Sequence, residues 1–258
     1  MSGHYFSKTG GLSPDGKSII NTKGTNAPVV RRRCAESDGS GYLTFPNGAI
    51  SGVVGSDWCL AFCINPTTLG ASQMILGSFD TTGTTKRFYI SINNGTLVFR
   101  FGTGETESIS TAGFFSTGTN YLIMICYSNT TGVITTKIKN LDTGTVTDGA
   151  DYTPVGLTEL NDNALGVFSN SNGAATHFLG KLWNLRIWFS QQTFENMADL
   201  KYSTGTNLHA ELERSIYDIS GNGYHGTIKG TVDLAATYEN TSGVYSYNLN
   251  NGFDRYTD

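Results

Sequence analysis

The sequence predicts an all-β protein, built as a two-sheet antiparallel sandwich with one short helix. Glycine occurs 32 times in 258 residues, and Ser, Thr and Asn fill most gaps between apolar runs, which is typical of short strands joined by tight turns. Within the runs, apolar and polar residues alternate at the period of a strand with one buried face. Hydrophobic residues make up 38% of the chain, enough for one principal core.

The run at residues 57–66 shows the alternation most clearly. On an extended strand, Trp58 and Phe62 fall on one face, and Cys59 and Cys63 fall on the other. We therefore expect a strand whose large residues point into the core.

Residues 87–102 predict a hairpin. Asn94 and Gly95 separate two alternating runs, and both residues accept the positive φ angles of a type I′ turn. Residues 120–127 are apolar at successive positions, as expected of a central strand covered on both faces. Residues 133–141 predict the hairpin partner of that strand.

A change of period predicts the helix. Phe194, Met197 and Leu200 recur every third residue after Thr193, which can serve as an N-cap. We expect one short helix near residues 193–202, packed over an end of the sandwich.

Charge excludes one class of partner. Seventeen basic and 21 acidic residues give a formal net charge of −4, so we expect no nucleic-acid partner. The one basic run, Arg31 to Arg33, is interpreted as a solvated or strand-edge cluster. The longest apolar run, residues 121–127, is too short to cross a bilayer, and the first ten residues lack a signal-peptide pattern. We therefore expect a soluble chain with no membrane insertion and no export signal.

The four cysteines give no clear framework. They show neither zinc-type pairing with histidines nor the density of a disulfide scaffold. We interpret them as reduced thiols within strands; they are Cys34, Cys59, Cys63 and Cys126.

Composition divides the chain into three parts. Residues 1–33 have little periodicity and are expected to form an arm for attachment or oligomer contact. Residues 34–230 hold the sandwich, in which residues 163–190 add at least two strands. Residues 231–258 are expected to form an extension that packs on the sandwich or completes it.

The order of these segments resembles the laminin-G-like, or concanavalin A-like, jelly-roll sandwich of lectins and extracellular adhesion modules. GYLTFPNGAISG followed by SDWCLAFCINP is similar to the family's opening strands, and residues 163–202 resemble its closing strands and terminal helix. The resemblance covers roughly residues 40–230 and implies a jelly-roll fold.

The segment YDISGNGYHGTIKG, residues 217–230, is similar to an Asp-x-Ser-Gly-Asn-Gly-x-x-Gly turn that often starts such domains. In this chain it follows the helix. Either the strand order is permuted and the tail supplies a strand, or the motif belongs to a separate appendage. We favour the first alternative, because a missing strand would expose an unpaired edge.

Glycan-cleaving relatives of this fold use a Glu-x-Asp-x-x-Glu pattern that places acid and nucleophile side by side. The sequence lacks that pattern. The nearest pairs, Glu105 with Glu107 and Glu211 with Glu213, are interpreted as solvated charges. We therefore expect a protein that is not an enzyme.

Sugar binding needs an aromatic face with polar groups at its rim. Asp148, Asp151 and Tyr152 could supply that combination, and the two aspartates could supply oxygens to Ca²⁺. An ordinary acidic turn is the alternative. No cofactor is required, and calcium stays open.

Trp183 and Trp188 lie five residues apart, so a regular strand would point them to opposite faces. We expect Trp183 to be the exposed one; the alternative is that a helix or arm covers both. Tyr224 and His225 form a second candidate surface on the Gly-rich turn, where a tyrosine has little core to enter. Asp218 is expected to cap that turn through its own backbone.

The resemblance, the missing export signal and the missing catalytic pattern together suggest a bacteriophage virion protein. It would be made in the host cytoplasm, display a lectin-like sandwich to a host-surface glycan, bind other virion proteins through its arm, and form a homo-oligomer. The alternatives are a capsid or tail decoration protein that makes only protein contacts, and a polysaccharide-cleaving enzyme. Fold alone does not choose among them.

Overall fold

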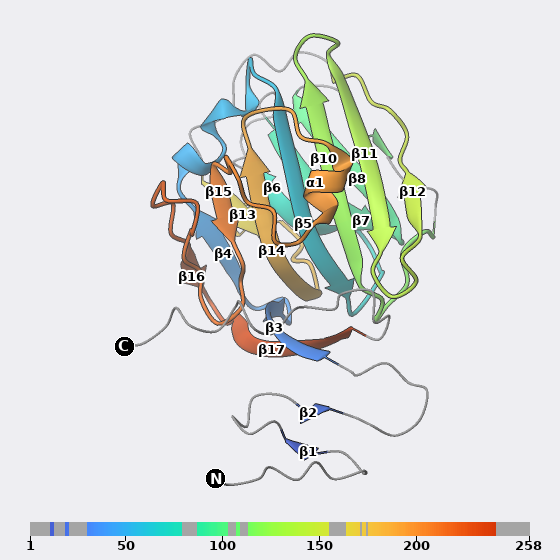
Figure 1. Ribbon diagram of the computed structural model, residues 1–258, viewed down its shortest axis with the longest axis vertical. Coiled ribbons are helices and arrows are strands. Elements are labelled where there is room, and N and C mark those ends of the chain that lie inside the picture. Colours follow the sequence, from blue (N-terminus) through green and yellow to red (C-terminus); the bar gives the residue numbers. More distant parts are fainter. Residues whose placement is uncertain are drawn as a thin grey trace, which may run out of the picture.

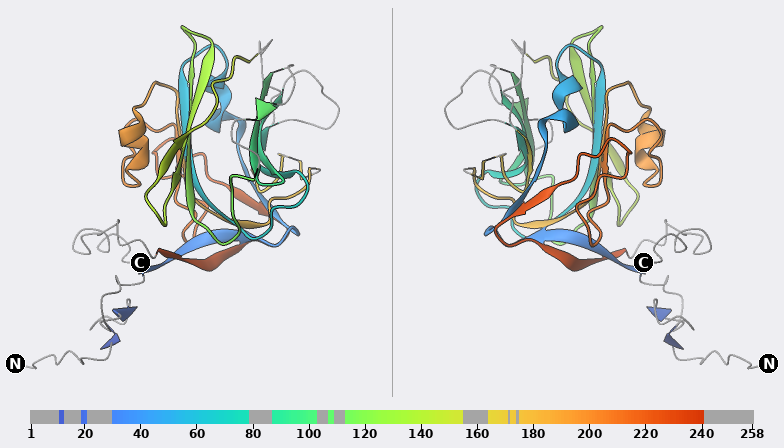
Figure 2. Two further views of the ribbon diagram at one scale, coloured as in Figure 1. Left: turned by 90° about the vertical axis from the view of Figure 1, so that its right-hand side faces the viewer. Right: turned by 90° about the vertical axis from the view of Figure 1, so that its left-hand side faces the viewer.

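The computed structural model describes residues 11–12, 19–20, 30–78, 87–102, 107–108, 113–154, 164–170, 172–173 and 175–240. It is an all-β sandwich of two antiparallel sheets (Figures 1 and 2), as predicted. No helix in the described part is long and apolar enough to span a membrane.

The larger sheet has eight strands in the order β12-β11-β10-β5-β14-β3-β17, with β15 also paired to β14. Its members are β3 (Val30–Ser37), β5 (Trp58–Pro66), β10 (Tyr121–Ser128), β11 (Val133–Asn140), β12 (Val146–Asp148), β14 (Gly180–Trp188), β15 (Leu208–Ala210) and β17 (Asp233–Asn240).

The smaller sheet has seven strands in the order β16-β4-β13-β6-β7-β8-β9. They are β4 (Tyr42–Phe45), β6 (Gln73–Ser78), β7 (Arg87–Asn93), β8 (Thr96–Gly102), β9 (Glu107–Ser108), β13 (Leu165–Val167) and β16 (Thr227–Lys229). The remaining elements are the pair β1 (Gly11–Leu12) and β2 (Ile19–Ile20), the 3₁₀ turns η1 (Asn47–Ala49) and η2 (Ser51–Val53), and helix α1 (Phe194–Ala198).

The main core lies between the two sheets and follows the predicted alternation. Trp58 and Phe62 point into it from β5, and the Trp58 ring lies 5.5 Å from Phe101 and 5.9 Å from Tyr127. The predicted hairpin is confirmed as β7 and β8, with Asn94 at φ 48° and Gly95 at φ 74°. β10 is buried on both faces between β5 and β11, as its unbroken apolar run predicted.

The tail of the chain completes both sheets. β16, which lies at the end of the Gly-rich segment 217–230, pairs with β4, and β17 pairs with β3 along the edge of the larger sheet. Of the two alternatives for residues 217–230, the structure has the one in which the segment adds a strand to the same sandwich. β3 runs across the expected boundary at residue 33, and the division into three parts stays a prediction.

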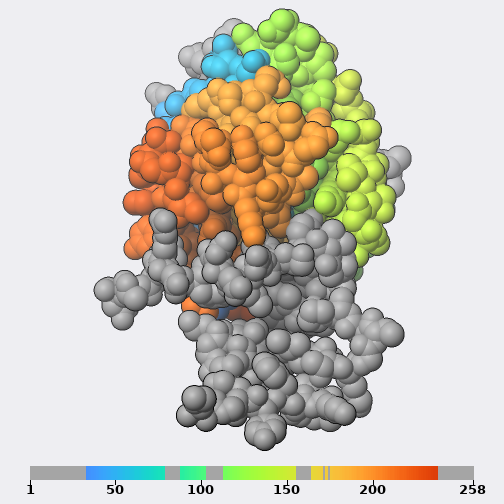
Figure 3. Space-filling view, viewed as in Figure 1, coloured from blue at the N-terminus to red at the C-terminus, as the bar shows by residue number. Residues whose placement is uncertain are grey.

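A second core covers the outer face of the larger sheet. Helix α1 begins after Thr193, whose side chain accepts a hydrogen bond from the Asn196 amide as the predicted N-cap. The helix lies on the sheet's outer face and not over an end of the sandwich (Figure 2), because Met197 packs onto apolar residues of that face. The segment that follows β14, orange in Figure 3, covers the middle of this side of the molecule.

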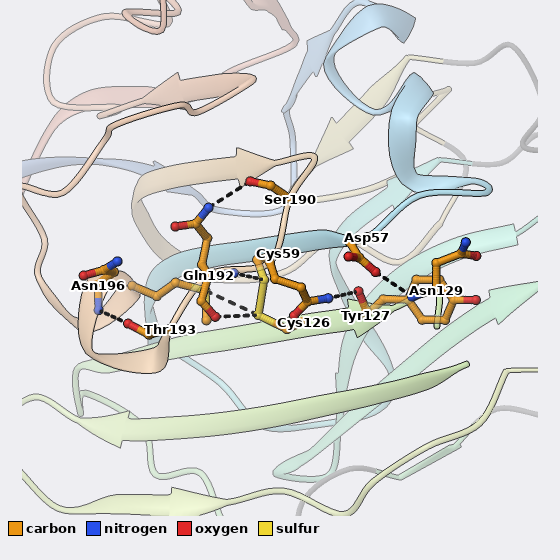
Figure 4. The surroundings of a disulfide bond; sticks show 11 residues. Asp57, Cys59, Cys126, Tyr127, Asn129, Ser190, Gln192, Thr193 and Asn196 are labelled. Atoms are coloured by element: carbon orange, nitrogen blue, oxygen red, sulfur yellow. Dashed lines mark hydrogen bonds between the residues drawn. A yellow bond between two sulfur atoms is a disulfide. The ribbon is translucent and has the colours of Figure 1, made fainter. Parts of the chain in front are cut away.

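The expectation of four reduced cysteines was wrong for two of them. Cys59 and Cys126 stand directly opposite each other on β5 and β10, and they form a disulfide that closes a separation of 67 residues. The disulfide lies under the segment before α1 (Figure 4), where the Gln192 amide donates to Cys59 Sγ at 3.2 Å. Cys34 and Cys63 are free and buried, and burial raises the pKa of each thiol to about 12.

The expectation that Trp183 is exposed was also wrong. The register of β14 shifts between Trp183 and Arg186, where Asn184 has φ 54°. This bulge adds one residue, so that Trp183 and Trp188 fall on the same outer face instead of opposite faces. Trp183 is 1% exposed there, beneath the segment that carries α1. The structure therefore has the alternative arrangement, in which a helix covers both tryptophans.

Candidate functional site

The candidate site is the loop of residues 211–226, which we call the Asp218 loop. It leads from β15 of the larger sheet to β16 of the smaller one, along one side of the sandwich (Figure 1). Its chain is fixed by backbone hydrogen bonds at two points, from the Ile219 amide to the His209 carbonyl and from the Gly226 amide to the Ile216 carbonyl, both 2.8 Å.

The Asp218 carboxylate organises the loop from inside. One oxygen accepts from the amides of His209 at 3.0 Å and Ser220 at 2.9 Å, and the other accepts from the Tyr224 amide at 3.0 Å and the Ser220 hydroxyl at 2.8 Å. Burial raises the pKa of Asp218, but hydrogen bonds from these donors outweigh it and hold the pKa below its ordinary value. Asp218 therefore caps its turn, as predicted.

Side chains tie the loop to the rest of the sandwich. The Ser220 hydroxyl and the Asn222 amide both donate to the Asn207 carbonyl, at 3.0 and 2.9 Å. Asn207 in turn donates to the carbonyls of Gly48 and Ala49, at 3.2 and 3.0 Å. The loop is thus connected through side chains to the turn that follows β4.

This ordered loop presents apolar side chains to solvent. Tyr217 is 62% exposed and Ile219 is 47% exposed. The Tyr217 and His225 rings contact each other edge to face, with centroids 5.1 Å apart. His225 Nδ1 accepts from the Asp218 amide at 3.1 Å, so the imidazole carries its proton on Nε2. An aromatic ring and a hydrogen-bond donor therefore lie side by side at the surface.

The two residues predicted for this loop behave differently. His225 is exposed, but Tyr224 is half-buried and packs against the main core. The expectation that a tyrosine here has little core to enter was wrong, because Gly48 has no side chain and leaves room for the Tyr224 ring.

The other predicted cluster does not assemble as a sugar site. The Asp148 carboxylate forms an ion pair with Lys137 at 2.8 Å, and Asp151 is exposed. Tyr152 is only 8% exposed, since its backbone pairs with Ile134 and its ring enters the core. No group of three or more metal-ligating side chains gathers in the described part of the chain.

Sequence reasoning missed Tyr217. A signal was present, because the Asp218 side chain must turn inward to cap the loop, and residues on either side of it then turn outward at a period of two. Tyr217 and Ile219 are those neighbours.

Comparisons with known proteins bear on the fold. No protein-family model matches the chain, and no curated protein matches it. Among solved structures, a candidate carbohydrate-binding protein from Bacteroides ovatus aligns with a TM-score of 0.58 and 16% identity over 81% of this chain. The chain spans 61% of the length of that protein. This likeness agrees with the jelly-roll sandwich fold of the present chain.

Two further solved structures align less closely. The carbohydrate-binding module, of class CBM40, from a Ruminococcus gnavus sialidase gives a TM-score of 0.48 and 10% identity, over 68% of this chain and 99% of the module. The enzymatically active domain of tailspike protein 2 from bacteriophage CBA120 gives 0.48 and 16% identity, over 72% of this chain and 34% of that one.

Proposed function

We propose that this chain is a carbohydrate-binding, lectin-like module that contacts its glycan through Tyr217 and His225 of the Asp218 loop. The observation that carries the proposal is the exposure of Tyr217, the one exposed residue among the tyrosines, phenylalanines and tryptophans of the described positions, in a loop held by a buried carboxylate. The lectin-like fold, shared with the Bacteroides ovatus protein, supports the same function.

The chemistry of the loop suits a sugar. The face of an aromatic ring packs against the apolar face of a pyranose, while nearby polar groups bond its hydroxyls. His225 offers an Nε2 donor, and the exposed Asn222 offers an amide oxygen. Because hydrogen bonds already fix the loop, binding costs little conformational entropy.

We propose that no catalysis follows binding. The sequence lacks the Glu-x-Asp-x-x-Glu pattern of glycan-cleaving relatives of the fold. Release of reducing ends from a bound polysaccharide would contradict this part of the proposal.

We further propose that the module is laminin-G-like and is displayed on a bacteriophage virion to bind a host-surface glycan, with residues 1–33 contacting other virion proteins. The support is compositional: a surface poor in charge and rich in Gly, Ser, Thr and Asn. Electron microscopy of particles with antibody against this chain should place it on the particle, and its absence there would contradict virion display. The homo-oligomer stays a prediction that analytical ultracentrifugation would check.

A glycan array tests the binding proposal. Tyr217→Ala should weaken binding of any glycan that the unaltered chain retains by about 10-fold or more, since 1.4 kcal/mol is a factor of ten and a stacked aromatic contributes about that much. Val146→Ala is the matched control, because Val146 is 50% exposed on β12, far from the loop in sequence.

Equal binding by the Tyr217→Ala variant would contradict the assignment of the loop. If the unaltered chain binds no glycan but is found on particles, the structure serves protein contacts alone, as in a decoration protein.

A further inference from the structure

The Asp218 loop exposes two apolar side chains, whereas stacking of a sugar ring needs only one. Four large apolar side chains of the described chain are exposed, and two of them, Tyr217 and Ile219, flank Asp218. The Tyr217 ring alone can pack against the apolar face of a pyranose. Ile219 is 47% exposed and takes no part in the contacts proposed above. Exposed apolar residues are ordinary when they are scattered singly, but these two lie together on one ordered loop.

The backbone holds Tyr217 and Ile219 on the same side of the loop. Asp218 lies between them and points inward, where its carboxylate accepts from the His209 amide at 3.0 Å. The Ile219 amide donates to the His209 carbonyl at 2.8 Å. Side chains two residues apart on an extended backbone point the same way and lie about 7 Å apart. A ligand that contacts both side chains therefore needs a second apolar group beside its ring.

The same loop offers a hydrogen-bond donor and an acceptor. His225 Nδ1 accepts from the Asp218 amide, so the Nε2–H group points away from the backbone. The His225 ring contacts the Tyr217 ring, with centroids 5.1 Å apart. The Asn222 side-chain nitrogen donates to the Asn207 carbonyl, which leaves the Asn222 amide oxygen as an acceptor. The loop therefore matches a ligand group that has both a carbonyl oxygen and an N–H.

The charge of this part of the loop favours a neutral ligand. Between Tyr217 and Gly226 the sequence has no Lys, Arg or Glu. Its one carboxylate, Asp218, is 5% exposed and already accepts four hydrogen bonds. Arg214 and Lys229, the nearest basic residues in the sequence, lie outside this stretch. A carboxylated sugar would find no paired donor here, and an amino sugar would find no accessible carboxylate.

We propose that the glycan bound by the Asp218 loop carries an N-acetylhexosamine. The inference rests on the proposed function, which assigns glycan binding to this loop. Tyr217 packs against the pyranose face, and Ile219 contacts the methyl group of the acetamide. His225 Nε2 donates to the acetamide carbonyl oxygen. The Asn222 amide oxygen accepts from the acetamide N–H, a group that an O-acetyl ester lacks.

NMR titration of the full chain with monosaccharides tests the sugar class. The methyl glycosides of N-acetylglucosamine and N-acetylgalactosamine are compared with those of the parent sugars glucose and galactose. In at least one pair the acetylated sugar should bind about 10-fold more tightly, because the acetamide adds a methyl contact and a hydrogen bond. Glucosamine and glucuronate, which carry a charge instead, should bind no more tightly than glucose.

Variants at exposed isoleucines test the acetamide contact. Ile219→Ser should reduce the preference for the acetylated sugar by about 4-fold, because one methyl contact is lost. Ile219→Val keeps a branched apolar side chain and should keep most of the preference. Ile228→Ser, the same change at a 39% exposed isoleucine on β16, is the matched control and should keep all of it. Tyr217→Ala should weaken binding of both sugars in a pair by a similar factor.

The outcomes separate this inference from the proposed function. If the parent sugars bind in a Tyr217-dependent way but neither pair shows a preference for acetylation, the inference is overturned and the proposed function stands. Tighter binding of glucosamine or glucuronate would also overturn it, because the loop would then recognise charge. An equal loss of preference in the Ile219 and Ile228 variants would overturn the contact with Ile219. Failure of every sugar to bind would contradict the proposed function, and the inference with it.

Discussion

Two segments of this protein are each ordered by one charged side chain that bonds to backbone groups. Arg186, fully buried, donates to the carbonyls of Met197, Asp199 and Tyr202, each at 2.8 Å, and so fixes the segment around α1. Asp218 accepts from three amides and so fixes the loop before β16. One segment is held by a cation bound to carbonyls, and the other by an anion bound to amides.

The two segments differ in how far they leave aromatic side chains exposed to solvent. The Arg186 segment covers Trp183 and Trp188, which are 1% and 0% exposed, whereas the Asp218 loop leaves Tyr217 62% exposed. An ordered segment can evidently bury its aromatic residues in this fold. The exposure of Tyr217 is therefore a property of a fixed loop and not of loose chain, which is what a binding surface requires.

The largest effect is expected from the disulfide that lies beneath the Arg186 segment. Reduction of Cys59–Cys126 should lower the free energy of unfolding by about 4 kcal/mol, because the bond closes a separation of 67 residues in the unfolded chain. Denaturant unfolding with and without a reductant measures this. The reductant should have no effect on a Cys59→Ala/Cys126→Ala double variant, and equal stability of the oxidised and reduced chains would contradict the prediction.

The next largest effect is expected from removing the buried Arg186 guanidinium, which fixes the segment around α1. Arg186→Met leaves three carbonyls without their donor, at about 1 kcal/mol or more each, so unfolding should become easier by about 3 kcal/mol. Tryptophan fluorescence should shift to the red as Trp188 loses its cover. Arg33→Met, at an exposed position, is the control, and a similar loss in both variants would argue against the role of Arg186.

His209 links the two segments and predicts a pH dependence. It stands opposite Arg186 on β14 and donates its amide to Asp218. Burial and, to a smaller extent, the positive charge of Arg186 lower the pKa of His209, while the negative charge of Asp218 raises it. The net result is a pKa lowered from 6.5 to about 4. The unfolded chain therefore takes up this proton first, and stability falls as pH drops from about 6.5 to about 4, by about 3 kcal/mol in total.

Urea unfolding at pH 7 and pH 4 measures that loss. His209→Gln keeps the backbone amide that Asp218 accepts but removes the titrating ring, so its stability should depend less on pH. An identical pH dependence in both proteins would show that His209 does not titrate as its burial requires.

The main core could be predicted from the sequence because alternation is a local property. Trp58 and Phe62 needed only the period of a strand, and the turn at Asn94 and Gly95 needed only the φ angles those residues tolerate. The Asp218 cap was predicted for the same reason, since the turn forms within a few residues of the carboxylate.

The rest depended on register, which neighbouring residues do not specify. The Cys59–Cys126 bond follows from the pairing of β5 with β10, and no spacing in the sequence reveals that pairing. The face of Trp183 depended on one inserted residue at Asn184.

The smallest expected effect is the most direct test of the comparison. Because Tyr217 and Ile219 are exposed, replacing both with Ser should change the free energy of unfolding by less than about 0.5 kcal/mol. Trp188→Ala, on the covered face, should cost about 3–5 kcal/mol. Thermal melting of the two variants beside the unaltered chain makes the measurement. A large loss in the Tyr217 and Ile219 variant would mean that these side chains stabilise the fold, and the argument that they are kept at the surface for a ligand would fail with it.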